Sequence, residues 1–256
     1  MLGLGTMLRS FLARKIGNAR LFSVSALCSG GPVIKVEPNP GIADKKVRIC
    51  VEGLPAASDV TLHARTQVTE KCFYESFAQY RVPTSGILDL EKEASIEGTY
   101  TGVKPMGLLW SMDGKADREE DIIRLIHRDV TTPQYINLKV HTGPINGVTH
   151  NDAIAETTIQ RLFMGPGVRR FDVRENGLVA TLFLPPGNGP FPGVITLFGG
   201  YPGIAEFKAA LLATNGFAAL GLAYYGTEHL TPNFAQTLDM EYFENAVKFL
   251  TSHESV

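Results

Sequence analysis

The pattern of apolar and polar positions is most regular between residues 169 and 225, where short apolar runs alternate with turns rich in Gly and Pro. Three runs are predicted to form β-strands: Thr181–Leu184, Gly193–Phe198 and Phe217–Ala223. The third is apolar at nearly every position, which is typical of a strand buried on both faces of a parallel sheet. Asn176-Gly177 separates the first run from Arg169–Arg174, and Asn-Gly between two strands predicts a tight hairpin.

A helix is predicted between the second and third of these strands. Apolar residues recur at helical spacing within Glu206–Thr214, and Asn215-Gly216 then supplies residues suited to a left-handed helix cap. Strand, loop, helix and strand form a βαβ unit, which usually belongs to a parallel α/β sheet. Ligands bind such sheets at the carboxyl ends of strands. Here that place holds Gly199-Gly200-Tyr201-Pro202-Gly203, although a simple tight turn has the same composition.

A second helix is predicted over Leu238–Leu250, near the end of the chain. Its apolar residues again recur at helical spacing. Asp239 and Glu241 lie early in this segment and Lys248 lies late, which complements the dipole of a helix.

The segment from Val33 onward has a different pattern, with short alternating or apolar runs separated by Gly, Pro and Ser. This spacing is typical of an antiparallel β-sandwich. The runs are Lys46–Val51, Val60–Val68, Cys72–Tyr80, Gly86–Leu90, Gly107–Met112, Tyr135–His141 and Ala155–Phe163. Trp110, the single tryptophan, is predicted to anchor the core. With a boundary at Met164–Gly167, we expect a β-sandwich domain over residues 33–163 and an α/β domain over residues 168–256.

Residues 1–30 differ from both domains, because they carry Arg9, Arg14, Lys15 and Arg20 and the first acidic residue is Glu37. Cationic, Ser-containing segments of this kind with an apolar helical face are typical of mitochondrial transit peptides. We therefore expect removal of this leader and a location in the mitochondrial matrix. The alternative is a secretory signal with residues 21–28 as its hydrophobic region.

Composition narrows the function classes. With 44% hydrophobic and 20% charged residues, the 256-residue chain has enough apolar side chains to form hydrophobic cores. The net charge is −2 and Lys and Arg do not cluster locally, so the sequence does not predict a basic surface that binds nucleic acid. No apolar run is long enough to span a membrane, and no metal-ligand spacing is present, so we expect neither a metal nor a cofactor. The three cysteines (Cys28, Cys50 and Cys72) include no Cys-x-x-Cys pair, which suits a reducing compartment.

Three long strings carry a family resemblance: residues 181–226, residues 98–112 (GTYTGVKPMGLLWSM) and residues 128–140 (RDVTTPQYINLKV). From about Ile34 to its end, the chain resembles the acyl-CoA thioesterase and bile-acid-CoA:amino-acid N-acyltransferase family. The resemblance implies a β-sandwich followed by the first half of an α/β-hydrolase domain, with acyl-CoA as substrate. It also implies that the loop Gly199-Gly200-Tyr201 supplies one N–H of the oxyanion hole, with Gly199, Gly200 and Tyr201 as candidates, and that the other N–H comes from the residue after the nucleophile. It says nothing about the oligomeric state.

The nucleophile of an α/β-hydrolase stands in a Gly-x-Ser-x-Gly elbow, followed later in the chain by an acid and a base. No Gly-x-Ser-x-Gly or Gly-x-Cys-x-Gly occurs in the 256 residues, so no catalytic residue is assigned. In the relatives the elbow follows the helix that corresponds to Leu238–Leu250, so we expect a truncated, inactive chain of a thioesterase that hydrolyses acyl-CoA to fatty acid and CoA. Two alternatives stay open: a relative that transfers the acyl group to an amino acid, and a non-catalytic truncated product.

Overall fold

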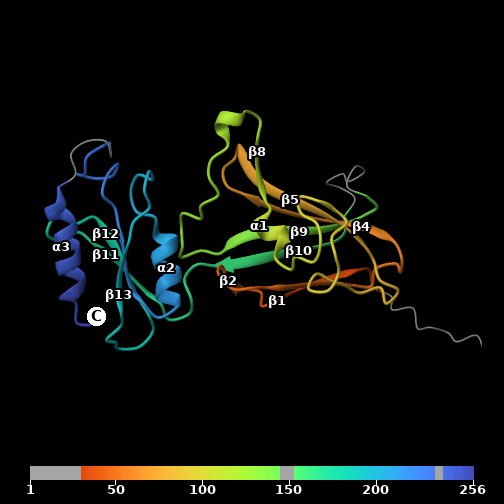
Figure 1. The fold of residues 1–256 in the computed structure, drawn as a ribbon, viewed down its shortest axis with the longest axis horizontal. Coiled ribbons are helices and arrows are strands. Elements are labelled where there is room, and N and C mark those ends of the chain that lie inside the picture. The colour runs from red at the N-terminus through yellow and green to blue at the C-terminus, as the bar shows by residue number, and fades with distance from the viewer. Residues whose placement is uncertain (1–29, 145–152, 234–238) are drawn as a thin grey trace, which may run out of the picture. The chain divides into compact units, whose positions relative to one another are not determined.

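The computed structural model describes residues 30–144, 153–233 and 239–256, which form three β-sheets and a few helices (Figure 1). The predicted leader with Cys28, most of the turn region after Gly143, and Leu238 lie outside the described residues. Among the described residues no helix is both long and apolar enough to cross a bilayer.

The first two sheets contain the strands of the N-terminal region. The smaller sheet has the order β1 (Val33–Glu37), β3 (Arg48–Glu52) and β6 (Leu88–Asp89), all antiparallel. The larger sheet has the order β2 (Gly41–Ile42), β10 (Ala153–Leu162), β9 (Gln134–Thr142), β4 (Asp59–Gln67), β5 (Cys72–Arg81) and β7 (Glu97–Gly98), and β8 (Asp113–Ala116) also pairs with β5. Only β2 runs parallel to its partner. A 3-10 turn, η1 (Glu119–Asp121), follows β8.

One hydrophobic cluster joins these two sheets. It contains Ile49 and Val51 from β3 and Leu62, Leu138 and Ile159 from β4, β9 and β10, each fully buried. Side chains of successive strand residues point to opposite faces, so the inner rows of both sheets meet in one core. The all-β character predicted for the N-terminal region is confirmed. β1 was not predicted from the sequence; it lies ahead of the first predicted strand, Lys46–Val51.

The apolar run Gly107–Met112 is not a strand. Residues Gly107–Trp110 form a short helix, α1, and the expectation that Trp110 lies in the core was wrong, because its side chain is 61% exposed. The Tyr100 ring packs so closely on Gly107 that any Cβ there would collide with it. In the helical turn that follows, Leu108 is buried, and Trp110, two residues further on, faces away from it.

The third sheet has the order β11 (Arg169–Val173), β12 (Ala180–Leu184), β14 (Ala218–Leu222) and β13 (Gly193–Thr196). The β11–β12 hairpin turns at Asn176 and Gly177, whose φ angles of 52° and 73° are both positive, as the Asn-Gly pair predicted. β12 runs antiparallel to β14, whereas β13 and β14 are parallel.

Two helices cover opposite faces of this sheet (Figure 1). Alternation along the strands places Leu182 and Leu220 in the cluster that contains α3 (Met240–Thr251), and Phe183 and Ala219 in the cluster that contains α2 (Glu206–Thr214). The predicted bounds of α2 are those observed. The region is therefore a three-layer α/β arrangement; its assignment to the α/β-hydrolase fold stays a prediction. Gly31–Val256 cluster into one unit, so the predicted domain boundary is also untested.

Candidate functional site

The candidate site is the loop that follows β13, at the carboxyl end of that strand. Residues Phe198–Tyr201 line one side of a cavity of about 260 Å³, and the extended segment Ile123–Arg128 lines the other. These two segments are more than 70 residues apart in the chain. The fold therefore joins a glycine-rich turn of the α/β region to an irregular segment that follows η1.

The loop presents backbone donors toward solvent. The Tyr201 N–H donates to the Phe198 carbonyl at 3.1 Å and so closes a tight turn around Gly200, whose φ is +72°. Within the described parts of the chain, the N–H groups of Gly199 and Gly200 donate to no acceptor. Free N–H groups in such a turn can bind an anion or a developing oxyanion.

The loops after the two parallel strands hold each other in place. The Gly203 N–H donates to the Tyr225 carbonyl at 3.0 Å. Gly226, with a φ of +71°, lies against Pro202, and a Cβ on Gly226 would come within 2.5 Å of the Pro202 ring. Glycine is therefore required at position 226 for two reasons, the left-handed backbone and the close approach of the neighbouring loop.

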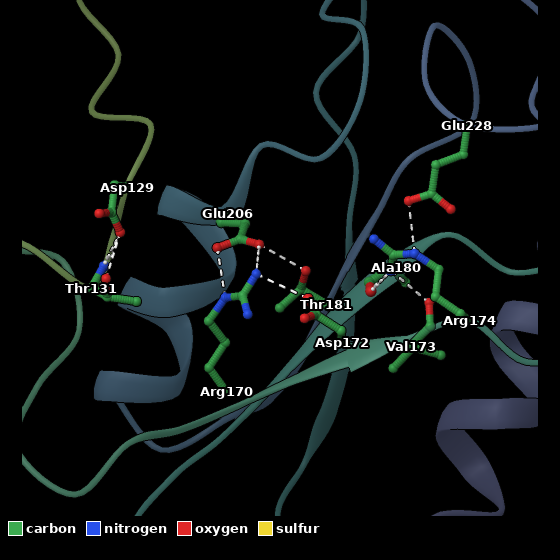
Figure 2. Close-up of polar contacts among 10 residues, drawn as sticks. All are labelled: Asp129, Thr131, Arg170, Asp172, Val173, Arg174, Ala180, Thr181, Glu206 and Glu228. Atoms are coloured by element: carbon green, nitrogen blue, oxygen red, sulfur yellow. Dashed lines mark hydrogen bonds and ion pairs between the residues drawn. The ribbon is translucent and has the colours of Figure 1, made fainter.

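A half-buried ion pair fixes the start of α2, directly after the loop (Figure 2). The Arg170 guanidinium donates from Nε to Glu206 Oε2 at 3.0 Å and from Nη2 to Glu206 Oε1 at 2.6 Å. Thr181 Oγ1 donates to the same Oε1 at 2.8 Å. The hydrogen bonds to Glu206 raise the pKa of Arg170 above its ordinary value. Bidentate geometry of this kind is strong and directional, so β11 and β12 together position the first residue of α2.

Two further contacts in Figure 2 support the surroundings of the site. Arg174 donates from Nε to Glu228 Oε1 at 2.8 Å and from Nη1 to the carbonyls of Val173 and Ala180, which ties the loop after β14 to the hairpin. Asp129 Oδ1 accepts from the Thr131 N–H and hydroxyl, and these bonds hold the pKa of Asp129 below its ordinary value. This second contact fixes the turn that follows Arg128.

The structure brings all three predicted oxyanion-hole residues, Gly199, Gly200 and Tyr201, to the wall of one cavity. It adds Arg124 and Arg128, which the sequence analysis did not select; their only signal was an Arg-x-x-x-Arg spacing within an apolar stretch. The free cysteines Cys50 and Cys72 are buried on β3 and β5, and burial raises the pKa of the Cys50 thiol. Among the described residues no cluster of His, Cys, Asp or Glu is arranged to hold a metal.

An antiparallel β region followed by an α/β sheet defines the fold class of this chain, and ligands of α/β sheets bind at the carboxyl ends of strands, where the Gly199–Gly200 turn lies. Residues 44–175 match the family described as "Acyl-CoA thioester hydrolase/BAAT N-terminal region". The chain therefore belongs to the acyl-CoA thioester hydrolase/BAAT family.

Named relatives agree with this assignment. The chain is 42% identical to "Acyl-coenzyme A thioesterase 2, mitochondrial" of Homo sapiens over 83% of this chain and 43% of that protein. It is 42% identical to "Acyl-coenzyme A thioesterase 1" of Homo sapiens over 83% of this chain and 49% of the relative. The identity to "Acyl-coenzyme A thioesterase 3" of Mus musculus is also 42%, over 88% of this chain and 51% of the relative. The chain thus spans about half the length of the curated relatives it matches.

Proposed function

We propose that this chain is part of an acyl-CoA thioesterase, which hydrolyses acyl-CoA to a fatty acid and free CoA. The observation that carries the proposal is the loop Phe198–Tyr201, which lines a cavity after β13 and in which the N–H groups of Gly199 and Gly200 donate to no acceptor among the described residues. The thioesterase names of the relatives support the same reaction. The substrate class is therefore an acyl-CoA thioester.

The loop would act when a nucleophile attacks the thioester carbonyl and negative charge develops on its oxygen. We propose that the N–H groups of Gly199 and Gly200 are the donors for this oxyanion, because the N–H of Tyr201 already closes the turn. One such donor contributes about 2.7–4 kcal/mol to stabilisation of the transition state. The ion pair between Arg170 and Glu206 would keep this loop in place through the start of α2.

The reaction also needs a nucleophile, an acid and a base. No Gly-x-Ser-x-Gly or Gly-x-Cys-x-Gly elbow occurs in these 256 residues. We therefore propose that the α/β region is the beginning of an α/β-hydrolase domain. We expect a polypeptide of these residues alone not to turn over acyl-CoA, because positioned donors accelerate nothing without an attacking group.

An assay of free thiol released from a long-chain acyl-CoA tests both the thioesterase function and the expected inactivity of these 256 residues alone. The 256-residue polypeptide is compared with one that is continued by the C-terminal half of a relative such as acyl-coenzyme A thioesterase 2. We expect turnover from the longer polypeptide only. A rate on the order of 1 s⁻¹, ordinary for an enzyme, from the 256 residues alone would mean that the reaction uses other groups. Cys50 and Cys72 would then be substituted first.

The oxyanion role is tested in the longer polypeptide by Gly199→Pro, which removes the N–H. We expect kcat to fall about 10²–10³-fold. Gly199→Ala is the matched control, since it keeps the N–H and its Cβ would meet nothing closer than the Tyr224 hydroxyl at 3.8 Å. Equal loss in both variants would show that the N–H of Gly199 has no special role.

Acyl transfer to an amino acid is the second candidate, since the description of the family names both activities. Adding glycine or taurine to the thiol-release assay distinguishes the two. Detection of an N-acyl amino acid by mass spectrometry would show that the function is acyl transfer and not hydrolysis. Release of fatty acid alone, at a rate independent of the amine, favours the thioesterase.

For location, we propose the mitochondrial matrix, with residues 1–30 as a cleaved leader. The Arg-rich N-terminus without acidic residues supports this, and relatives from Homo sapiens, Mus musculus and Rattus norvegicus carry "mitochondrial" in their names. Intact-mass measurement on protein purified from mitochondria should give a start between Arg20 and Lys35. An unprocessed form as the main species, or protein found in the secretory pathway, would reject the leader.

A further inference from the structure

The segment Ile123–Arg128 lines two adjoining cavities. On one side lies the cavity of about 260 Å³ beside the glycine loop, and on the other a cavity of about 330 Å³ that reaches Gln67 and Thr69 at the turn between β4 and β5. Ile123, Ile126 and Arg128 line both. A ligand that starts at the glycine loop can therefore continue past Arg128 into the second cavity.

Three cations gather along this path. Arg124 and Arg128 belong to the segment itself, and Lys208 is on the first turn of α2. The Arg124 guanidinium lies 4.9 Å and the Lys208 ammonium 4.5 Å from the centroid of one ring, that of Phe198. Both cations thus lie near the Phe198 ring, and positive charge gathered in one place favours the binding of an anion.

These cations have no counter-ion of their own. In the part of the chain that the structure describes, neither Arg124, Arg128 nor Lys208 forms an ion pair. In the acidic run that precedes the segment, Glu120 and Asp121 pair with Arg118. The Asp129 carboxylate, next to Arg128 in the chain, is held by Thr131.

The spacing of Arg124 and Arg128 along the chain suits an elongated anionic ligand. Four residues of extended chain span about 13 Å at most, so Arg124 and Arg128 can contact groups that lie well apart on one ligand. Guanidinium groups bind phosphate in a planar, bidentate manner. Of the two parts of an acyl-CoA, the CoA part carries phosphate groups, and its thioester end would lie at Gly199 and Gly200.

We propose that Arg124, Arg128 and Lys208 form the binding site for the phosphate groups of coenzyme A, with the nucleotide end of the coenzyme directed into the cavity next to Gln67 and Thr69. This inference rests on the proposed function, because it takes acyl-CoA as the ligand. It assigns to the irregular segment Ile123–Arg128 the task of holding the coenzyme while the loop after β13 holds the thioester.

Calorimetric titration of CoA into the 256-residue polypeptide tests the site without requiring hydrolysis. We expect Arg124→Gln and Arg128→Gln each to weaken CoA binding about tenfold or more, the loss of one charge-assisted contact. Lys104→Gln is the matched control, since Lys104 is exposed and lines neither cavity; it should leave the dissociation constant within twofold. Arg128→Lys should retain only part of the affinity, because an ammonium keeps the charge but not the bidentate geometry. Melting curves confirm that each variant is folded.

Ligand fragments locate the phosphates. Adenosine 3′,5′-bisphosphate should compete with CoA, and pantetheine, which has no phosphate, should be insensitive to the two arginine substitutions. Binding of CoA should weaken as salt rises. Competition by inorganic phosphate as effective as that by the bisphosphate would show a non-specific anion cluster instead. Unchanged CoA affinity in both arginine variants, or no CoA binding, would overturn the proposal.

The longer polypeptide separates this inference from the proposed function. If CoA binding depends on the arginines but no thiol is released, the proposed thioesterase function is wrong and the proposed CoA site is supported. The opposite outcome is that thiol is released with the same KM for acyl-CoA in Arg124→Gln, Arg128→Gln and the control. In that case the proposed CoA site is wrong and the thioesterase function is supported.

Discussion

At the scale of single residues, the contact between Arg170 and Glu206 should be among the most important for stability. Both side chains are less than one-third exposed, at 29% and 14%. Arg170→Met keeps the length of the side chain but leaves the Glu206 carboxylate with Thr181 alone. We expect the free energy of unfolding in urea to fall by about 2–3 kcal/mol.

Two controls define this prediction. Arg118→Met removes the ion pairs with Glu120 and Asp121, and because the Arg118 side chain is 61% exposed the free energy of unfolding should change by less than about 0.5 kcal/mol. Glu206→Gln added to Arg170→Met should recover part of the loss, because the half-buried charge of Glu206 is then removed and only the exposed Asp172 has lost its partner. Equal effects of Arg170→Met and Arg118→Met would contradict the assignment.

A second residue-scale prediction concerns pH. Arg48 Nη2 donates to Asp89 Oδ2 at 2.7 Å, and this bond, aided by the Glu91 N–H, holds the pKa of Asp89 below its ordinary value. A depressed folded-state pKa means that the stabilisation is present above about pH 4, the unfolded pKa, and is lost as pH falls through the folded pKa.

Asp89→Asn should therefore lower the free energy of unfolding by about 1 kcal/mol at pH 7, a modest amount because Arg48 is half exposed. Between about pH 4 and pH 2 the difference from the unsubstituted protein should shrink toward zero. Denaturant titrations at several pH values measure it, with the exposed Asp117→Asn as control. A difference that does not vary with pH would exclude the ionised Asp89 as its cause.

At the scale of elements, β13 is an edge strand of the α/β sheet. In the described sheet it pairs with β14 on one side only and forms the end of the strand order. Ile195 packs into the cluster around α3, but Leu197, next to the strand, is 43% exposed. An open strand edge with apolar neighbours is a template for association between chains.

We expect Leu197→Lys to raise the concentration at which the 256-residue polypeptide stays monomeric, while its melting temperature changes little. Val103→Lys is the control, because Val103 is 47% exposed in the N-terminal region, away from β13. Sedimentation velocity over a concentration series provides the measurement. The same degree of association in both variants would show that the β13 edge is not the contact.

At the scale of the whole molecule, the N-terminal core is complete in itself. The cluster between the two sheets draws its fully buried residues only from Ile34 to Ile159. A polypeptide of residues 31–165 should therefore unfold cooperatively on heating and give dispersed amide resonances. A featureless melt would show that the α/β region is needed to fold it.

Val130 refines this prediction, because it packs with Phe183 and α2 in the other region. Val130→Ala should cost about 1–2 kcal/mol in the 256-residue polypeptide, where the side chain is 1% exposed. In the 31–165 polypeptide, which lacks those partners, the same substitution should be nearly neutral. Equal costs in the two would place the packing partners of Val130 within residues 31–165.

The sequence by itself determined the elements whose signals are local. Asn176-Gly177 specified the hairpin, because both residues accept positive φ. The apolar spacing and the Asn-Gly that follows specified α2 to its observed ends. The family was also readable from contiguous strings, since residues 128–140 and 98–112 lie within the matched range.

Only the tertiary structure decided the features that depend on residues distant in sequence. Whether Gly107–Met112 became a strand or a helical turn depended on the Tyr100 ring against Gly107, and the result left Trp110 exposed. The cavity that brings Arg124 and Arg128 to the Gly199–Tyr201 loop joins segments that no local pattern relates. Turn and helix signals act over a few residues, whereas packing and charge clusters depend on the path of the whole chain.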